Sequence, residues 1–169
     1  MQGLKNAYTR RVLYFNAKQE KNMSNQKTIK FEVVTPESVV LKDEVTQVTV
    51  PTQNGEITIL PDHIPLVASL SHGVIETKTK SGETKIMSVS GGFVEVLKNK
   101  VVILADTAER AEEIDLARAE EARKRAEDIK TQAVHKDDVD FADISAKITK
   151  EMARARAAKK WRKIKGLDH

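Results

Sequence analysis

The residues best suited to acid–base chemistry are four histidines, one of which, His63, follows directly after Asp62 in the stretch LPDHIPL. An imidazole beside a carboxylate can act as a general base or as a metal ligand. The four histidines lack metal-ligand spacing, however, and the chain has no cysteine to serve as a nucleophile or zinc ligand. We therefore interpret His63 as a hydrogen-bonded turn residue and expect neither a catalytic residue nor a bound metal.

Glycine-rich phosphate loops are absent from the sequence. It contains no GxxxxGK[ST], no GxGxxG and no GxSxG nucleophile elbow. The one glycine pair, in Ser90-Gly91-Gly92, is too short for such a loop and lies between predicted strands, where it indicates a bulge or a tight corner. An enzyme acting alone is therefore the weakest of the functional hypotheses.

The strongest charge signal is a basic segment near the end of the chain. Residues 147–165 contain one acid, Glu151, among lysines and arginines at positions 147, 150, 154, 156, 159, 160, 162, 163 and 165. Such a segment indicates an acidic partner, which can be nucleic acid, anionic lipid or an acidic protein surface, or else a solvated helix face. Trp161 is the only aromatic residue inside it, which gives little support to stacking on single-stranded nucleic acid.

The elements before residue 106 are predicted to be strands. TIKFEVV, EITIL and ETKIMSVS alternate apolar and polar residues, and Ser81-Gly82 between two such runs indicates a hairpin turn. EVTQVTVP alternates with a slip of one residue, which predicts a β-bulge. The spacing of the turns predicts an antiparallel β-sandwich, in the form of a flattened barrel.

After residue 106 the period becomes helical. Asp106 and Glu109 have the spacing of a capping box, so a helix is expected to begin there. HKDDVD, at 135–140, separates two helical patterns and predicts an αα-hairpin. The apolar positions are Ala119, Ala122, Ala126, Ile129 and Ala133, followed by Phe141, Ile144, Ile148, Met152 and Ala155. Because alanine buries little apolar area, we expect the hairpin to detach easily from the sandwich.

The chain is thus predicted to be an α+β protein in two parts, a sandwich over residues 23–106 and a helical hairpin over 107–165. Residues 1–22 do not share the strand pattern, and we interpret them as a transit-like extension or as translation from a start upstream of Met23. The longest apolar runs, such as VVILA, are far shorter than the roughly 20 residues that a membrane-spanning helix needs.

Three stretches together resemble the epsilon subunit of the F-type rotary ATP synthase. They are NGEITILPDHIPLVASL, VSGGFVEVLKNKVVILADTAERAEEIDLARAEEARKRAE and ARARAAKKWRK. Their order and spacing agree with the two-part organisation, and the resemblance covers about residues 27–165.

The resemblance implies a non-catalytic rotor subunit of a proton- or sodium-driven ATP synthase. It implies that the sandwich couples the gamma subunit to the c ring through a surface that includes Glu56 and His63. It also implies a peripheral position at the cytoplasmic face of the inner (cell) membrane. The alternative from the residues alone is a free-standing β-sandwich module whose basic helical arm binds nucleic acid.

The resemblance further implies a nucleotide site, because some epsilon subunits bind ATP in the hairpin through an [IL]DxxRA motif. No cofactor is required, and ATP would be a regulatory ligand. Lys150 stands where ATP-binding members carry Arg, which predicts a weaker grip on phosphate. The alternative is that these charges form pairs within the helices. The candidate residues are Glu109, Ile114, Asp115, Arg118, Ala119, Arg125 and Arg154.

The last implication is inhibition of ATP hydrolysis by the second helix. Between a compact form on the sandwich and an extended form, the helix would carry its cations to an acidic segment of the catalytic beta subunits. This inhibitory arm comprises Arg154, Arg156, Lys159, Lys160, Arg162 and Lys163.

Overall fold

The structure, a computed structural model, describes residues 26–133 and 141–167. The N-terminal extension predicted at 1–22 and the break predicted at 135–140 lie outside the described residues. The strands are β1 (Ile29–Val34), β2 (Val39–Thr52), β3 (Gly55–Ile59), β4 (Leu66–Ser69), β5 (Gly73–Thr79), β6 (Thr84–Val89), β7 (Phe93–Leu97), β8 (Lys100–Leu104) and β9 (Ala108–Arg110), and a 3₁₀ turn η1 (Ala111–Glu113) and helices α2 (Leu116–Ala133) and α3 (Phe141–Lys165) follow.

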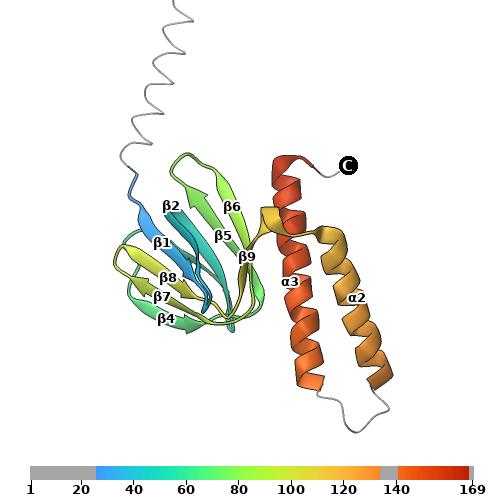
Figure 1. The fold of residues 1–169 in the computed structure, drawn as a ribbon. Coiled ribbons are helices and arrows are strands. Elements are labelled where there is room, and N and C mark those ends of the chain that lie inside the picture. Colours follow the sequence, from blue (N-terminus) through green and yellow to red (C-terminus); the bar gives the residue numbers. More distant parts are fainter. Residues whose placement is uncertain (1–25, 134–140, 168–169) are drawn as a thin grey trace, which may run out of the picture.

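The predicted β-sandwich is confirmed, and it is made by one long sheet folded on itself (Figure 1). The strand order is β4-β7-β8-β1-β2-β5-β6-β9, with β3 paired to β2 off this path. The first half of β2 pairs with β1 and its second half with β3 and β5, so β2 joins the two layers. The sheet does not close into a barrel, since β4 and β9 end the path. One pairing among the described strands, β1 with β8, is parallel rather than antiparallel.

Local features of the sheet follow the sequence pattern. The slip predicted in EVTQVTVP is confirmed as a register shift between Val45 and Gln47 in the pairing with β5. The corner predicted at Ser90-Gly91-Gly92 is tight at Gly92, whose φ is 105°. A Cβ atom on Gly92 would lie 2.1 Å from the carbonyl oxygen of Leu104, so a larger residue would displace β8.

The core of the sandwich consists mainly of branched apolar side chains. Phe31, Val33, Val45, Ile75 and Val94 are at most 1% exposed, and they belong to one continuous cluster between the layers. Burying each such side chain contributes about 1.5–3 kcal/mol relative to exposure. The alternation that identified the strands therefore also selects the residues that hold the layers together.

The predicted start of the first helix is wrong. Residues 108–110 form β9, which pairs antiparallel with β6, and the backbone N–H of Ser90 donates to Thr107 at 3.0 Å. Because β6 offers a free edge there, ladder hydrogen bonds replace the capping box expected from Asp106. The helix α2 begins instead at Leu116, where the Oδ1 atom of Asp115 accepts the backbone N–H of Arg118 at 3.1 Å. The division of domains at residue 106 stays a prediction.

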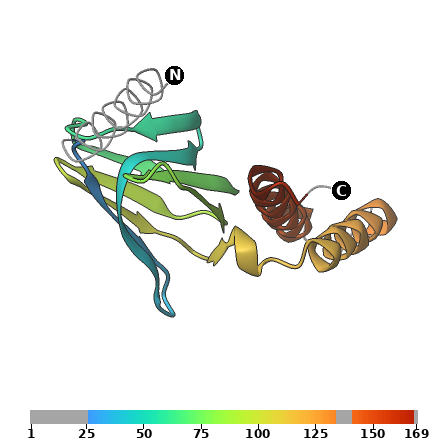
Figure 2. The ribbon, with the colours of Figure 1, turned by 90° about the horizontal axis from the view of Figure 1, so that it is seen from above.

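The helices form the predicted pair, and α3 lies between the sheet and α2 (Figures 1 and 2). Of the apolar positions that indicated a helix here, Ala119 is fully buried, whereas Ile129 is 54% exposed. The side chains of Ala133 and Phe141 lie outside the described residues. Those of Ile144, Ile148 and Met152 are half-buried, and Ala155 is buried.

Candidate functional site

The fully buried α3 side chains of the contact with the sheet are alanines, and the half-buried Trp161 packs against the same cluster. Ala157 and Ala158 are at most 2% exposed, and they pack against Ile86 of β6, Ala111 of η1 and Ile114. Alanine lets the helix backbone come close to the sheet, but it removes little apolar surface from water. The expectation of an alanine-rich contact is confirmed. Ala155, which the sequence pattern singled out, belongs to the same buried cluster as Ala157 and Ala158, which it did not single out. That the hairpin detaches easily stays a prediction.

Arg154 is the most firmly held cation of α3. Its Nε and Nη2 atoms donate to the two carboxylate oxygens of Glu109 at 2.7 and 3.1 Å, and its Nη1 atom donates to Glu151 at 2.9 Å. Hydrogen bonding to Glu109, with a smaller contribution from Glu151, raises the pKa of Arg154 against the opposing effect of burial. A bidentate pair of partly buried groups is stronger than an ordinary surface ion pair.

The structure brings together only some of the predicted nucleotide-binding residues. Glu109, Lys150 and Arg154 line one cavity of about 360 Å³ between β9 and α3. Ile114 and Ala119 are buried in the contact between the hairpin and the sheet, where they have a packing role. Glu109 and Arg154, separated by 45 residues in sequence, are bound to each other in this cavity.

The remaining candidates lie on α2, away from that cavity. Asp115 caps the helix, and Arg118 and Arg125 are exposed. The Nη1 atom of Arg125 lies 3.9 Å from Glu121, one turn earlier. That contact agrees with the alternative of pairing within the helix for Arg125, and the nucleotide site as a whole stays a prediction.

Two lysines of the predicted inhibitory arm are paired with acids outside α3. The Nζ atom of Lys159 lies 2.6 Å from Glu120 of α2, and that of Lys160 lies 2.5 Å from Glu76 of β5. The side chain of Glu76 is only 21% exposed, so this pair is partly shielded from water. In the docked arrangement the arm is therefore partly neutralised by its own chain.

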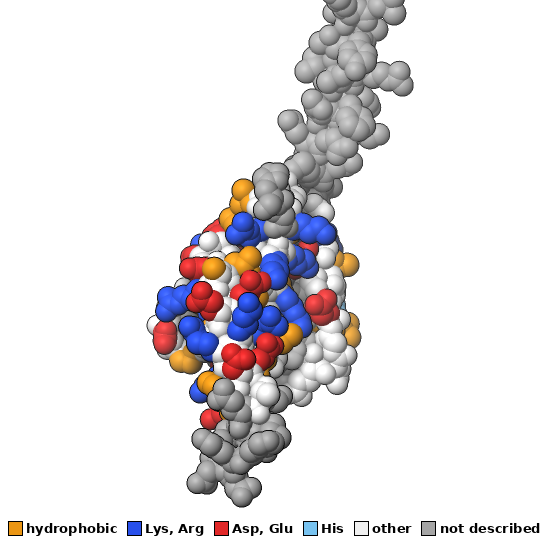
Figure 3. Space-filling view, turned by 90° about the vertical axis from the view of Figure 1, so that its right-hand side faces the viewer, with side chains coloured by type: hydrophobic (Ala, Val, Ile, Leu, Met, Phe, Trp, Pro, Cys, Tyr) orange, Lys and Arg blue, Asp and Glu red, His pale blue; other side chains and the backbone are white. Residues whose placement is uncertain are grey.

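The other arm residues differ in their surroundings. Arg156 is exposed and lines a groove of about 170 Å³ between α2 and α3. Arg162 donates from Nη2 to the carbonyl oxygen of Leu167 at 3.4 Å, and Lys163 is exposed. Viewed from the helical side, lysines and arginines are interspersed with acids (Figure 3). The basic segment therefore does not form an uninterrupted positive patch in this arrangement.

The predicted rotor-interface residues lie in β3 and the turn that follows it. Glu56 is exposed on β3. His63 donates from its backbone N–H to Leu60 at 3.2 Å and from Nδ1 to the carbonyl oxygen of Ile64 at 2.7 Å, so its expected role in a hydrogen-bonded turn is confirmed. Ile64 is 75% exposed, which leaves an apolar side chain at the tip of this turn.

An apolar outer face of the sandwich was missed in the sequence. Val67, Phe93, Leu97 and Leu104 are each between 45% and 67% exposed, and they lie on β4, β7 and β8. Phe93 pairs directly with Leu104 across the ladder. The sequence FVEVL of β7 could have indicated this face, because apolar residues occur at both its odd and its even positions and therefore point to both sides of the sheet. These four residues form the outer face.

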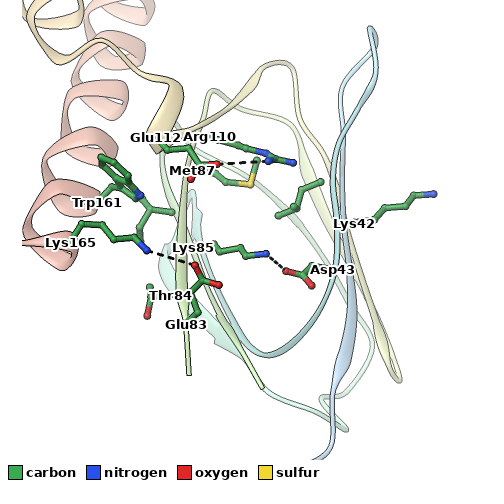
Figure 4. A pocket seen from close by; sticks show the side chains of 12 residues that line it. Lys42, Asp43, Glu83, Thr84, Lys85, Met87, Arg110, Glu112, Trp161 and Lys165 are labelled. Atoms are coloured by element: carbon green, nitrogen blue, oxygen red, sulfur yellow. Dashed lines mark hydrogen bonds and ion pairs between the residues drawn. The ribbon is translucent and has the colours of Figure 1, made fainter. Parts of the chain in front are cut away.

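A larger cavity, of about 470 Å³, separates the C-terminal end of α3 from the sheet. Trp161 and Lys165 enter it from α3 and face the strand side (Figure 4). Its charges are paired with one another, because Lys165 lies 3.7 Å from Glu83 and Lys85 lies 2.7 Å from Asp43. Next to the buried alanines, α3 therefore faces the sheet across a cavity and is not closely packed against it.

In the described ranges 26–133 and 141–167, no group of three or more His, Cys, Asp or Glu side chains is placed to hold a metal ion. None of the helices in these ranges combines the length and apolar character of a transmembrane segment.

Comparison with known proteins gives consistent matches. A family model described as "ATP synthase, Delta/Epsilon chain, beta-sandwich domain" matches residues 28–111. The ATP synthase epsilon chain of Chloroflexus aggregans is 48% identical over 130 residues, which is 77% of this chain and 91% of that protein. The ATP synthase epsilon chain of Koribacter versatilis is 54% identical over 100 residues, covering 59% of this chain and 70% of that protein.

A solved structure shares the fold. It is a chain in the cryo-EM structure of the Euglena gracilis mitochondrial ATP synthase comprising OSCP, F1 and the c ring, with a TM-score of 0.64 and 24% identity. The match covers 78% of this chain and 81% of that chain. The C. aggregans alignment is longer than the family-model match, so the similarity in sequence extends beyond the sandwich.

Proposed function

Because the chain belongs to the ATP synthase epsilon family, we propose that it is a non-catalytic subunit in the central stalk of a rotary ATP synthase driven by protons or sodium ions. In this role the sandwich couples the gamma subunit to the c ring, and the hairpin restrains ATP hydrolysis. The subunit is held peripherally, at the cytoplasmic face of the cell membrane. The observation that carries the proposal is the division into a sandwich with an apolar outer face and a basic helix held by a thin contact.

The outer face supports docking on the rotor. Exposed apolar residues that adjoin one another, as Phe93 and Leu104 do, mark interaction surfaces more often than single exposed residues. We assign this face to the gamma subunit, the partner that the family implies. The turn that carries His63 and the exposed Ile64, together with Glu56, is assigned to the c ring.

The hairpin supports a restraint on hydrolysis that can be released. The seam of Ala157 and Ala158 binds α3 weakly enough that a docked and an extended form can lie within a few kcal/mol of each other. In the extended form the arm binds an acidic segment of the catalytic beta subunits and blocks rotation in the hydrolysis direction.

Regulatory ATP would require a rearrangement of the ion pairs. Nucleotide would have to displace Glu109 from Arg154, and Arg118 and Arg125 would have to approach from α2. Lys150 lacks the fork geometry of Arg, which lowers the expected affinity. Titration calorimetry of the subunit with ATP tests this part, and an absence of heat at millimolar concentrations would reject it.

The nucleic-acid alternative is not favoured by the geometry. Lys159 and Lys160 are paired with acids of the same chain, and Trp161 packs beside the sheet rather than standing free for stacking on bases.

The decisive experiment is made on the assembled complex. The quadruple variant Arg154→Ala, Arg156→Ala, Lys159→Ala and Lys160→Ala keeps helix propensity and removes the central charges of the arm. ATP hydrolysis is expected to rise while ATP synthesis is largely retained.

The matched control removes four exposed cations elsewhere, with Lys42, Lys78, Lys80 and Lys124 changed to Ala. Hydrolysis by this control should equal that of the wild type. Unchanged hydrolysis by the arm variant in a correctly assembled complex would reject an inhibitory arm built on those charges.

A further inference from the structure

Three ion pairs join α3 to acids of the sheet side. Arg154 binds Glu109 of β9, Lys160 binds Glu76 of β5, and Lys165 approaches Glu83 in the turn between β5 and β6. The N–O distance is 2.7 Å for Arg154–Glu109, 2.5 Å for Lys160–Glu76 and 3.7 Å for Lys165–Glu83. These acids come from three separate segments of the chain, which only the folded sandwich brings to one side.

The paired cations are interleaved with the apolar side chains of the contact. At about 3.6 residues per turn, Arg154 and Lys165 are about three turns apart and point nearly the same way, between the directions of Ala157 and Ala158, while Lys160 lies beyond Ala157. The ion pairs therefore add to the apolar contact that the alanines and Trp161 make with the sheet side.

The three pairs differ in strength. The side chains of Arg154 and Glu109 are 23% and 33% exposed, whereas those of Lys165 and Glu83 are 44% and 52% exposed. Partly buried pairs are screened less by salt than exposed ones. We therefore expect Glu109 and Glu76 to hold α3 more firmly than Glu83.

Building on the proposed function, we propose that Glu76, Glu83 and Glu109 form an acidic counter-surface inside the subunit, which competes with an acidic partner surface for the same cations of α3. An ammonium or guanidinium group bound to the sandwich is not available to a second carboxylate in the same geometry. Docking therefore masks the arm, and the apparent affinity of the arm for its partner falls with the fraction of molecules in which α3 is docked.

The test uses the isolated full-length subunit and its single tryptophan, Trp161. Trp161 is half-buried beside the sheet in the cavity of Figure 4, so its emission reports the docking of α3. The variant Glu76→Gln with Glu83→Gln keeps side-chain size and removes two carboxylates that are not among the predicted nucleotide-binding residues. The control Glu37→Gln with Glu44→Gln removes the same charge from the β1–β2 region.

An oligoglutamate peptide serves as the acidic probe. We expect the E76Q/E83Q variant to bind it up to about tenfold more tightly than the wild type, since each exposed or partly exposed pair contributes a few-fold at most. The Trp161 emission of this variant should already be red-shifted at low salt. The wild type should reach the same emission only at about 1 M salt, where the screening length falls to about 3 Å. The E37Q/E44Q control should behave as the wild type.

A charge exchange keeps the test independent of simple loss of stability. Glu76→Lys alone should undock α3, and adding Lys160→Glu should restore the buried emission of Trp161. Equal peptide affinity in E76Q/E83Q and the wild type, or no restoration by the exchange, would overturn the counter-surface. These measurements need no assembled complex, so they are separate from the hydrolysis assay that tests the proposed function.

Discussion

The two contacts that hold this chain together are built from different side chains. Between the layers of the sandwich, Phe31 and Ile75 meet branched neighbours in a continuous buried cluster. Between α3 and the sheet, the buried Ala157 and Ala158 pack together with the half-buried Trp161, and ion pairs accompany them. We therefore expect the sandwich core to be a permanent contact, which opens only on unfolding. We expect the contact of α3 with the sheet to be a releasable one, which can open while each part stays folded.

The largest effect should come from the permanent contact. Phe31→Ala is expected to lower the free energy of unfolding by about 3–5 kcal/mol, because it removes a fully buried ring and leaves a cavity. Denaturant unfolding followed by circular dichroism measures it. Phe93→Ala on the outer face is the matched control, with an expected change within about 0.5 kcal/mol. Similar losses of stability in both variants would contradict the assignment of Phe31 to the core and of Phe93 to the outer face.

The releasable contact should respond to added bulk. Ala157→Leu places extra methyl groups where no space exists, so docking of α3 should weaken by about 1–3 kcal/mol while the sandwich stays folded. Emission of Trp161 should shift to the red, and the main unfolding transition of the sheet should keep its midpoint. If the sheet lost stability to the same extent, the two contacts would be one cooperative unit.

The sandwich itself should tolerate a stabilising change. The Oγ1 atom of Thr77 is buried in β5 and has no hydrogen-bond partner in the described part of the chain. Thr77→Val replaces this hydroxyl by a methyl group of similar size, so the free energy of unfolding should rise by about 1 kcal/mol. Trp161 emission should not change, because Thr77 points into the core and not toward α3. A loss of stability would indicate that the hydroxyl is satisfied in solution.

The smallest effect concerns acid. The hydrogen bond from Lys159 holds the pKa of Glu120 below its ordinary value of 4.5. A lowered pKa in the folded state means that this pair stabilises the contact between α2 and α3 above pH 4.5 and stops doing so as the pH falls through the lowered value. The difference in hairpin stability between the wild type and Lys159→Met should therefore disappear in acid. A difference that persists below the pKa of Glu120, measured by NMR titration, would reject the pair as its cause.

Most strands could be predicted because their signals are local. Alternation in EITIL and the turn at Ser81-Gly82 depend on residues that are neighbours in sequence, and the bulge near Gln47 follows from a slip within one strand. The alanine-rich helices could be recognised for the same reason. The start of the first helix could not, because the edge of β6 competes for residues 108–110 and lies some twenty residues earlier in the chain.

The sequence by itself determined the two-part organisation, the basic character of the last helix and the family resemblance, since periodicity, composition and motif order are all properties of the linear chain. Only the tertiary structure decided that Arg154 would bind Glu109 and that Lys160 would bind Glu76. It likewise decided that the exposed side chains of Phe93 and Leu104 would be neighbours across the β7–β8 pairing. Which residues far apart in sequence come into contact depends on how the strands pair and on how closely α3 approaches the sheet. Neither the strand pairing nor this approach can be predicted from a short stretch of residues.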